Sequence, residues 1–211
     1  MSIPWDAYRE VAPKGAIELL FRLAERVRHR RFLHINASRY GGGSPETLTR
    51  LVPMMSSLGI DAGWEVIVGD PKFYAGVHTL ERVLGGGDGL LTEELVRAHA
   101  EAAAENAQKL SLEADLVMVH ELAPLLLARH RPARGRWIWR CHTDLSRAPR
   151  RTWHLLRRDI ERYDAVVFSL PKFAQRLPLP SLIIHPSVDP LSDKNRDLTR
   201  AESQKLLDRL H

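Results

Sequence analysis

Short apolar runs alternate along this chain with longer stretches whose apolar residues recur every three or four positions. The runs are bounded by polar or glycine-containing segments and predict buried β-strands at 31–36, 64–68, 116–120, 137–141, 165–169 and 182–184. The periodic stretches predict helices at 16–30, 92–110, 123–131 and 149–163, one between Gly43 and Gly59, and a weaker one at 73–84. Strands that alternate with helices indicate an α/β fold, a Rossmann-like parallel sheet with helices on both faces.

A triple glycine directly follows the first expected strand and precedes an amphipathic helix. Glycines carry no side chain that keeps a ligand away, and a helix N-terminus offers free N–H groups suited to a phosphate or a sugar hydroxyl. We therefore interpret Gly41, Gly42 and Gly43 as a ligand loop, the alternative being a tight turn without a ligand. The spacing matches neither G-x-G-x-x-G nor G-x-x-x-x-G-K-[ST], which disfavours a dehydrogenase or an NTPase.

Polar residues gather where the expected strands end. Asn36 ends the first strand, His120 and Glu121 follow the third, and the segments 142–146 and 186–189 follow later strands. Since ligands of open parallel sheets bind beyond the carboxyl ends of the strands, we expect these groups to converge on one site. The histidines lack H-x-x-x-H spacing and no G-x-S-x-G is present, so a metal centre and a serine hydrolase are both disfavoured.

Composition narrows the class of protein further. The 211 residues suit one α/β domain with a small appendage, and the net charge of +5 falls on helix faces without interleaved aromatics, so a nucleic-acid partner is disfavoured. No apolar run reaches the length of a membrane span, and the N-terminus lacks the pattern of a secretory signal. With Cys141 as the one cysteine, a cytoplasmic protein is expected.

Several segments together resemble one enzyme family. They are His34-Ile35-Asn36 with the triple glycine, Leu58 to Ala62, Arg140-Cys141-His142 with the residues up to Ser146, and Pro186 to Asn195. From about residue 31 onward they resemble trehalose synthases of the NDP-glucose type, which are retaining glycosyltransferases of the GT-B fold. Arg140-Cys141-His142 and Asp189-Pro190-Leu191-Ser192 are the specific parts, while the glycine loop is shared with many related glycosyltransferases.

The resemblance implies a domain organisation and a reaction. Residues 1–190 would be the N-terminal, acceptor-side Rossmann-like half of a GT-B enzyme, and 191–211 an interdomain linker and tail helix with Leu206, Leu207 and Leu210. The C-terminal donor domain is absent from the chain. The family transfers glucose from NDP-glucose (ADP- or UDP-glucose) to glucose to give trehalose, and this half alone is expected to be inactive without a donor domain. No cofactor and no metal are expected.

The resemblance also assigns roles to residues. The catalytic positions correspond to His142 and Glu121. Donor phosphate or sugar binding corresponds to Gly41, Gly42, Gly43 and Arg140. Acceptor binding corresponds to Asn36, Glu46, His120, Asp144 and Ser146. Glu121 stands where the family has an aspartate, so the charge is kept and the side chain is longer by one methylene.

Two other functions remain open. The chain could be a stand-alone module that binds a sugar or a nucleotide sugar, or a structural half that pairs with another polypeptide. The expected partners are glucose or trehalose, NDP-glucose once a donor domain is supplied, and either a second copy in a homodimer or a separate donor-domain chain. No membrane partner is expected.

Overall fold

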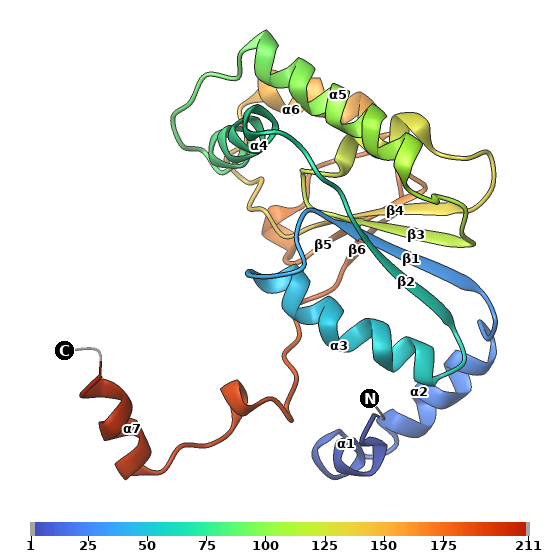
Figure 1. Ribbon diagram of the computed structural model, residues 1–211, viewed down its shortest axis with the longest axis vertical. Helices are drawn as coiled ribbons and strands as arrows, with labels where there is room; N and C mark the ends of the chain where they lie inside the picture. Colours follow the sequence, from blue (N-terminus) through green and yellow to red (C-terminus); the bar gives the residue numbers. More distant parts are fainter. Residues whose placement is uncertain (1–2, 210–211) are drawn as a thin grey trace.

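A six-stranded, all-parallel sheet in the order β2-β1-β3-β4-β5-β6 forms the centre of the molecule (Figure 1). The computed structural model describes residues 3–209. The strands are β1 (Arg31–Asn36), β2 (Asp61–Val66), β3 (Leu116–His120), β4 (Arg136–Cys141), β5 (Ala165–Phe168) and β6 (Ser181–Ile183). The Rossmann-like parallel sheet expected from the sequence is confirmed.

Helices cover both faces of the sheet. One face carries α4 (Pro71–Leu84), α5 (Glu93–Lys109) and α6 (Arg150–Ile160), and the other carries α3 (Gly43–Ser57) with α1 (Trp5–Val11) and α2 (Ala16–Glu25) beside it (Figure 1). Three 3₁₀ segments, η1 (Leu125–His130), η2 (Pro171–Phe173) and η3 (Asp193–Asn195), complete the connections, and the tail ends in α7 (Arg200–Leu207).

Alternation along the strands separates the core from the polar side of the sheet. Leu33, Val117 and Trp139 belong to the core cluster that also includes residues of α4, α5 and α6. Because neighbouring strand residues point to opposite faces, His34 and His120 lie on the other face, the one that α3 partly covers. The polar strand residues therefore share one face.

The path of the chain fixes where a ligand site can form. After β1 the chain adds β2 on one side, and it then returns to place β3 on the other side of β1. The connections that leave β1 and β3 therefore run to opposite faces of the sheet and part from each other at the carboxyl edge. Asn36 and His120 end these two strands.

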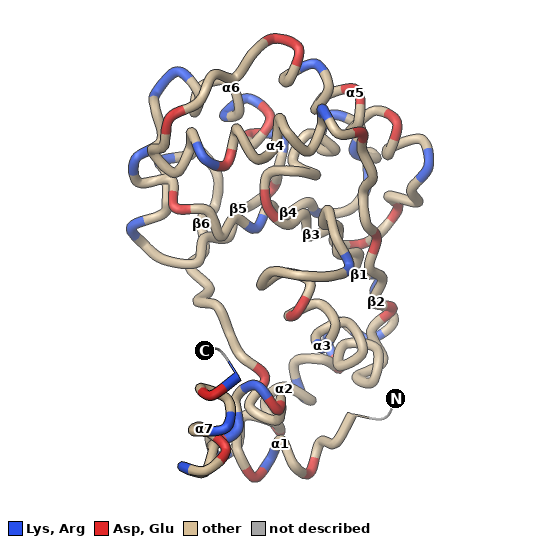
Figure 2. The backbone as a smooth tube through the Cα atoms, turned by 60° about the vertical axis from the view of Figure 1, so that its left-hand side comes forward, with Lys and Arg blue, Asp and Glu red and all other residues tan. Residues whose placement is uncertain are grey.

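Charged side chains are spread over the whole molecule. Lys and Arg alternate with Asp and Glu along the helices and the tail, and they do not gather in one segment (Figure 2). No helix within residues 3–209 is both long enough and apolar enough to cross a membrane.

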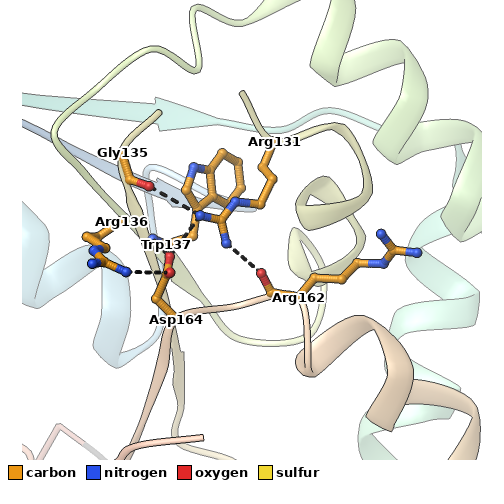
Figure 3. A network of polar contacts seen from close by, with 6 residues as sticks. All are labelled: Arg131, Gly135, Arg136, Trp137, Arg162 and Asp164. Atoms are coloured by element: carbon orange, nitrogen blue, oxygen red, sulfur yellow. Dashed lines mark hydrogen bonds and ion pairs between the residues drawn. The ribbon is translucent and has the colours of Figure 1, made fainter. Parts of the chain in front are cut away.

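An ion-pair network joins the amino ends of β4 and β5 (Figure 3). Asn36 and His120 end β1 and β3 at the opposite, carboxyl edge of the sheet. The Asp164 carboxylate accepts hydrogen bonds from the Trp137 amide at 2.8 Å, from Arg131 at 2.8 Å and from Arg136 at 3.0 Å. Arg131 also donates to the Gly135 carbonyl oxygen at 3.2 Å. The shared carboxylate of Asp164 therefore connects the two strand ends through hydrogen bonds and ion pairs.

Several expected elements differ from the structure in extent or type. The second strand covers Asp61–Val66 and not 64–68, because its first three residues, which have little strand propensity, pair with β1 from Arg31 onward. The first long helix ends at Glu25 and not at residue 30, since the next turns close with i→i+3 bonds and His29 adopts a φ of 63°. The expected helix 123–131 is the 3₁₀ segment η1, in which the Leu127 amide bonds to Pro124. Helix α1 was not expected.

The tail touches the domain at a few polar points. The Asp189 carboxylate accepts a hydrogen bond from the Tyr8 hydroxyl at 3.0 Å and pairs with Arg50 at 3.1 Å. Lys194 pairs with Glu46 at 3.0 Å. The tail helix bears Leu206 and Leu207, which are 47% and 52% exposed, while Leu210 lies outside the described residues.

Candidate functional site

Glu121 joins three segments at the carboxyl edge of the sheet. One carboxylate oxygen accepts a hydrogen bond from the Ser44 hydroxyl at 3.3 Å, and the other accepts one from the His142 amide at 3.2 Å. Ser44 lies in the first turn of α3, and His142 follows β4. Glu121 has a φ of 68°, a left-handed conformation that is uncommon for a residue with a Cβ. The loop after β3 is thus shaped around this carboxylate.

His142 continues the same chain of contacts to β5. Its Nδ1 lies 2.5 Å from the hydroxyl oxygen of Ser169, which directly follows β5, and its Nε2 lies 3.9 Å from Glu121 Oε1. The His142 and Glu121 side chains retain 28% and 26% of their exposure, so a ligand can reach both. The ends of β3, β4 and β5 and the start of α3 therefore meet in one polar group.

Burial shifts the pKa values of both Glu121 and His142. It raises the pKa of Glu121 to about 7, although the hydrogen bonds from His142 and Ser44 act in the opposite direction. Burial, followed by the positive charge of Arg140, lowers the pKa of His142 below its ordinary value of 6.5. Near neutral pH the carboxyl group therefore exists in both of its forms, while the imidazole is mainly neutral.

A pair of buried histidines lies on the same face of the sheet. His34 and His120 are each 3% exposed, and Nδ1 of the first lies 3.1 Å from Nε2 of the second. Burial, with a further contribution from Arg140, lowers the pKa of His34 to about 4, and burial followed by the nearby His34 lowers that of His120 to about 2. Their outer ring nitrogens and the Arg140 Nε have no partner among the described residues. These neutral rings retain unused hydrogen-bonding capacity.

The glycine loop is open to solvent. Gly41 and Gly42 have φ values of 71° and 75°, which explains glycine at these two positions, and helix α3 begins at Gly43. A Cβ at any of the three would meet nothing within 4 Å. A ligand can therefore approach the backbone of the loop closely.

The side chain of Asn36 is already hydrogen-bonded within the protein. Its side-chain oxygen accepts a hydrogen bond from the Trp64 indole at 2.9 Å, and its amide group donates to the Ser38 carbonyl oxygen at 2.8 Å. The residue is buried. In this structure Asn36 shapes the loop that leads to the glycines.

Four further residues expected at this edge make no hydrogen bond or ion pair with Glu121 or His142: Glu46, Asp144, Ser146 and Asp189. Glu46 pairs with Lys194, and Asp144 accepts a hydrogen bond from the Ser146 amide at 2.9 Å in a turn after β4. Asp189, which the sequence placed at the same edge, contacts Tyr8 and Arg50 instead. Sequence reasoning missed Ser44 and Ser169. Ser169 ends the expected strand 165–169, so its position at a strand end was the available signal.

Other features of the structure do not form a comparable site. Among residues 3–209 no three His, Cys, Asp or Glu side chains are grouped so that they could hold a metal ion. Burial raises the pKa of the Cys141 thiol far above its ordinary range. An open hollow of about 690 Å³ lies at the amino edge of the sheet, and its lining includes the ion pairs of Asp164 with Arg131 and Arg136.

The fold and this polar group define a class of protein. It is a Rossmann-like α/β domain with a solvent-accessible cluster of hydrogen-bonding groups at the carboxyl edge of its sheet, where the strand order reverses.

Comparison with known proteins identifies the family. Residues 34–175 match the family described as trehalose synthase, N-terminal domain. The chain is 36% identical to the trehalose synthase of Pyrococcus horikoshii, 37% to that of Thermococcus litoralis and 34% to that of Rubrobacter xylanophilus, over 97%, 97% and 95% of its own length. The chain belongs to the trehalose synthase family, to its N-terminal domain, and it spans about half (50%) of the length of each of these relatives.

Proposed function

We propose that this chain is the acceptor-side half of a retaining GT-B glycosyltransferase, which transfers glucose from NDP-glucose to glucose and so forms trehalose. Residues 1–190 would form the sugar-binding domain, and 191–211 would lead toward a donor-binding half. The observation that carries the proposal is the meeting of Glu121 and His142 at the start of α3, just behind the glycine loop, in a chain of this family.

The chemistry of the group suits a sugar. The carboxylate of Glu121 accepts hydrogen bonds from hydroxyl groups, and its raised pKa lets it take up a proton from an acceptor hydroxyl near neutral pH. His142 supplies a neutral, accessible imidazole beside it. The free N–H groups at the start of α3 suit a phosphate or sugar oxygen of the donor.

Glucosyl transfer requires more than this half supplies. Acceptor hydroxyl, anomeric carbon and leaving diphosphate must be held together, and the charge that develops on the diphosphate must be stabilised. We place the groups that hold the nucleotide in a second half, since the relatives are about twice as long as the region they share with this chain.

Sugar binding is tested by NMR titration of the 211-residue chain with glucose and trehalose. We expect dissociation constants on the order of millimolar, because so few contacts are available, and shift changes near Gly42, Glu121 and His142. Glu121→Gln should weaken binding, whereas Glu113→Gln at the opposite edge should not. Shift changes confined to the hollow around Asp164 would contradict the assignment.

Transfer is tested by assaying trehalose formation from NDP-glucose and glucose, with and without the second half of a relative supplied as a separate chain. We expect product only in the mixture, and none with His142→Ala. Turnover by the purified chain alone would contradict the half-enzyme proposal. Sugar binding without turnover in the mixture would instead identify a binding module, and pairing without sugar binding a structural half.

A further inference from the structure

A buried serine lies beside the Nδ1 atom of the His142 ring. Ser169 is 4% exposed, and its hydroxyl oxygen lies 2.5 Å from His142 Nδ1. No other hydrogen bond of this hydroxyl is formed within residues 3–209. Within the described residues, the Ser169 hydroxyl and His142 Nδ1 therefore have only each other as hydrogen-bond partners.

The direction of this hydrogen bond follows from what each atom can do. If Nδ1 carried the ring proton and donated it, the serine proton would be buried without an acceptor, which folded proteins rarely tolerate. If the serine donates to Nδ1, both groups are satisfied and the ring proton resides on Nε2. The second arrangement is favoured because it leaves no buried donor unpaired.

The other side of the ring agrees with this direction. His142 Nε2 lies 3.9 Å from Glu121 Oε1, and the ionised form of this carboxyl group, which is present near neutral pH, only accepts hydrogen bonds. The two oxygens of Glu121 already accept hydrogen bonds from the Ser44 hydroxyl and the His142 amide, so both face donors. An N–H at Nε2 fits this pattern, and a bare ring nitrogen would not.

We propose that Ser169 is a positioning residue that fixes His142 in the Nε2–H tautomer, so that the histidine meets a ligand oxygen as a hydrogen-bond donor and does not act as the proton-accepting base. The ligand group is an acceptor oxygen, such as the lone pair of a sugar hydroxyl. The identity of the ligand rests on the proposed function, whereas the tautomer does not. The task of accepting a proton then falls to Glu121.

His99 provides an internal reference for this assignment. Its Nε2 lies 2.8 Å from the Ala123 carbonyl oxygen, which can only accept, so this buried ring must also carry its proton on Nε2. His99 belongs to α5, which covers the face of the sheet opposite α3 (Figure 1). Its signals therefore report whether a variant still folds.

The tautomer is measured by two-bond ¹H–¹⁵N correlation NMR on the full chain near pH 7.5, where the ring is neutral, without any ligand. The His142 signals are assigned by their loss in His142→Gln. We expect the Nε2–H pattern in the native chain, a mixture of tautomers in Ser169→Ala, and the native pattern in Ser169→Thr, which keeps the hydroxyl. His99 should be unchanged throughout.

Glucose titration of the same samples adds a functional readout. Ser169→Ala should bind glucose about 3- to 10-fold more weakly, the effect expected of one misdirected hydrogen bond, and Ser169→Thr should bind as the native chain does. An Nδ1–H pattern in the native chain, or an unchanged pattern in a folded Ser169→Ala, would overturn the proposal. The expected tautomers in a chain that binds no sugar would uphold it and overturn the proposed function instead.

Discussion

Glu121 combines a strained backbone with a carboxyl group that is hard to ionise. Its left-handed φ of 68° is held by its amide, which donates to the Arg140 carbonyl oxygen at 2.8 Å, and by the Trp139 indole, which donates to the Glu121 carbonyl oxygen at 2.8 Å. Strain of this kind persists where the surroundings over-determine it, and such positions cluster at functional sites. The residue is therefore a sensitive place to test the site.

We expect Glu121→Gln to gain stability relative to the native chain as the pH rises. The native carboxyl keeps its proton up to about pH 7, whereas in the unfolded chain it loses it near its ordinary value of 4.5. Between these values the folded state binds more protons, so the native chain loses stability as the pH rises through this window, by about 2–3 kcal/mol in all. Glutamine does not titrate, so the Glu121→Gln variant does not lose this stability between the two pH values.

Urea unfolding of both proteins at pH 5 and pH 8 measures this difference. The buried histidines act in the opposite direction, because their lowered pKa values cost stability as the pH falls below 6.5, but they are common to both proteins and cancel. A stability difference that stays constant between the two pH values would show that Glu121 titrates normally.

The strand-end rule pointed from sequence to the two residues that lie together at the centre of the candidate site. Glu121 and His142 follow apolar runs whose ends are easy to see, and the same rule applied to strand 165–169 would have found Ser169. It could not find Ser44, because this residue belongs to helix α3 and does not follow a strand. It also misplaced Asp189, because its partners Tyr8 and Arg50 depend on how α1 and α3 pack. Burial, and with it every pKa, is a property of the folded chain.

At the scale of elements, a half-buried ion pair connects η1 to α6. Arg129 donates two hydrogen bonds to Asp159, at 2.8 and 2.7 Å, and the Asp159 side chain is only 7% exposed. We expect Asp159→Ala to destabilise the protein by about 2–4 kcal/mol, because it leaves a partly buried guanidinium without its partner. Denaturant unfolding measures the loss. Glu161→Ala, which removes a more exposed pair with Arg157, should cost about 0.5 kcal/mol or less.

Asp189 anchors the start of the tail on two helices. Besides Tyr8 and Arg50 it accepts a hydrogen bond from the Leu191 amide at 3.0 Å, and its side chain is largely buried. Asp189→Asn should weaken the ion pair and speed tryptic cleavage after Lys194 and Arg196 several-fold. Asp197→Asn, in the same exposed tail, is the matched control. Equal cleavage of both variants and the native chain would mean that other contacts hold the tail.

Elements with a strong local pattern were predicted well, and the others needed tertiary information. β1 and β3 begin and end as expected because their apolar runs are sharply bounded. β2 begins with Asp61-Ala62-Gly63, which has no strand character and is extended because it pairs with β1. Helix α1 is short, and the ring of Trp5 packs against Phe21 of α2 at 5.2 Å, a contact invisible in the sequence.

At the scale of the whole molecule, the sheet ends in an exposed strand. Leu182, Ile183 and the following Ile184 are 49%, 38% and 44% exposed, and β6 pairs with β5 on one side. Exposed apolar edge strands promote association. We expect concentration-dependent self-association in analytical ultracentrifugation, reduced by Ile183→Lys and not by Leu19→Lys on α2. A monomer at all concentrations would show that the edge is shielded and would remove one route to a homodimer, leaving a separate donor-domain chain as the expected partner.

The crossing of the chain at the centre of the sheet also determines when the site can exist. His34 and His120 are 86 residues apart in sequence, and Ser44 and Glu121 are 77 apart. Closing loops of this length is entropically costly and belongs to the slow part of folding for non-local topologies. The group around His142 therefore forms only after β3 has joined β1, and a probe placed there would follow the assembly of the central sheet. A chain emerging from the ribosome would lack the complete group until Ser169, the last of its residues, had been released from the exit tunnel.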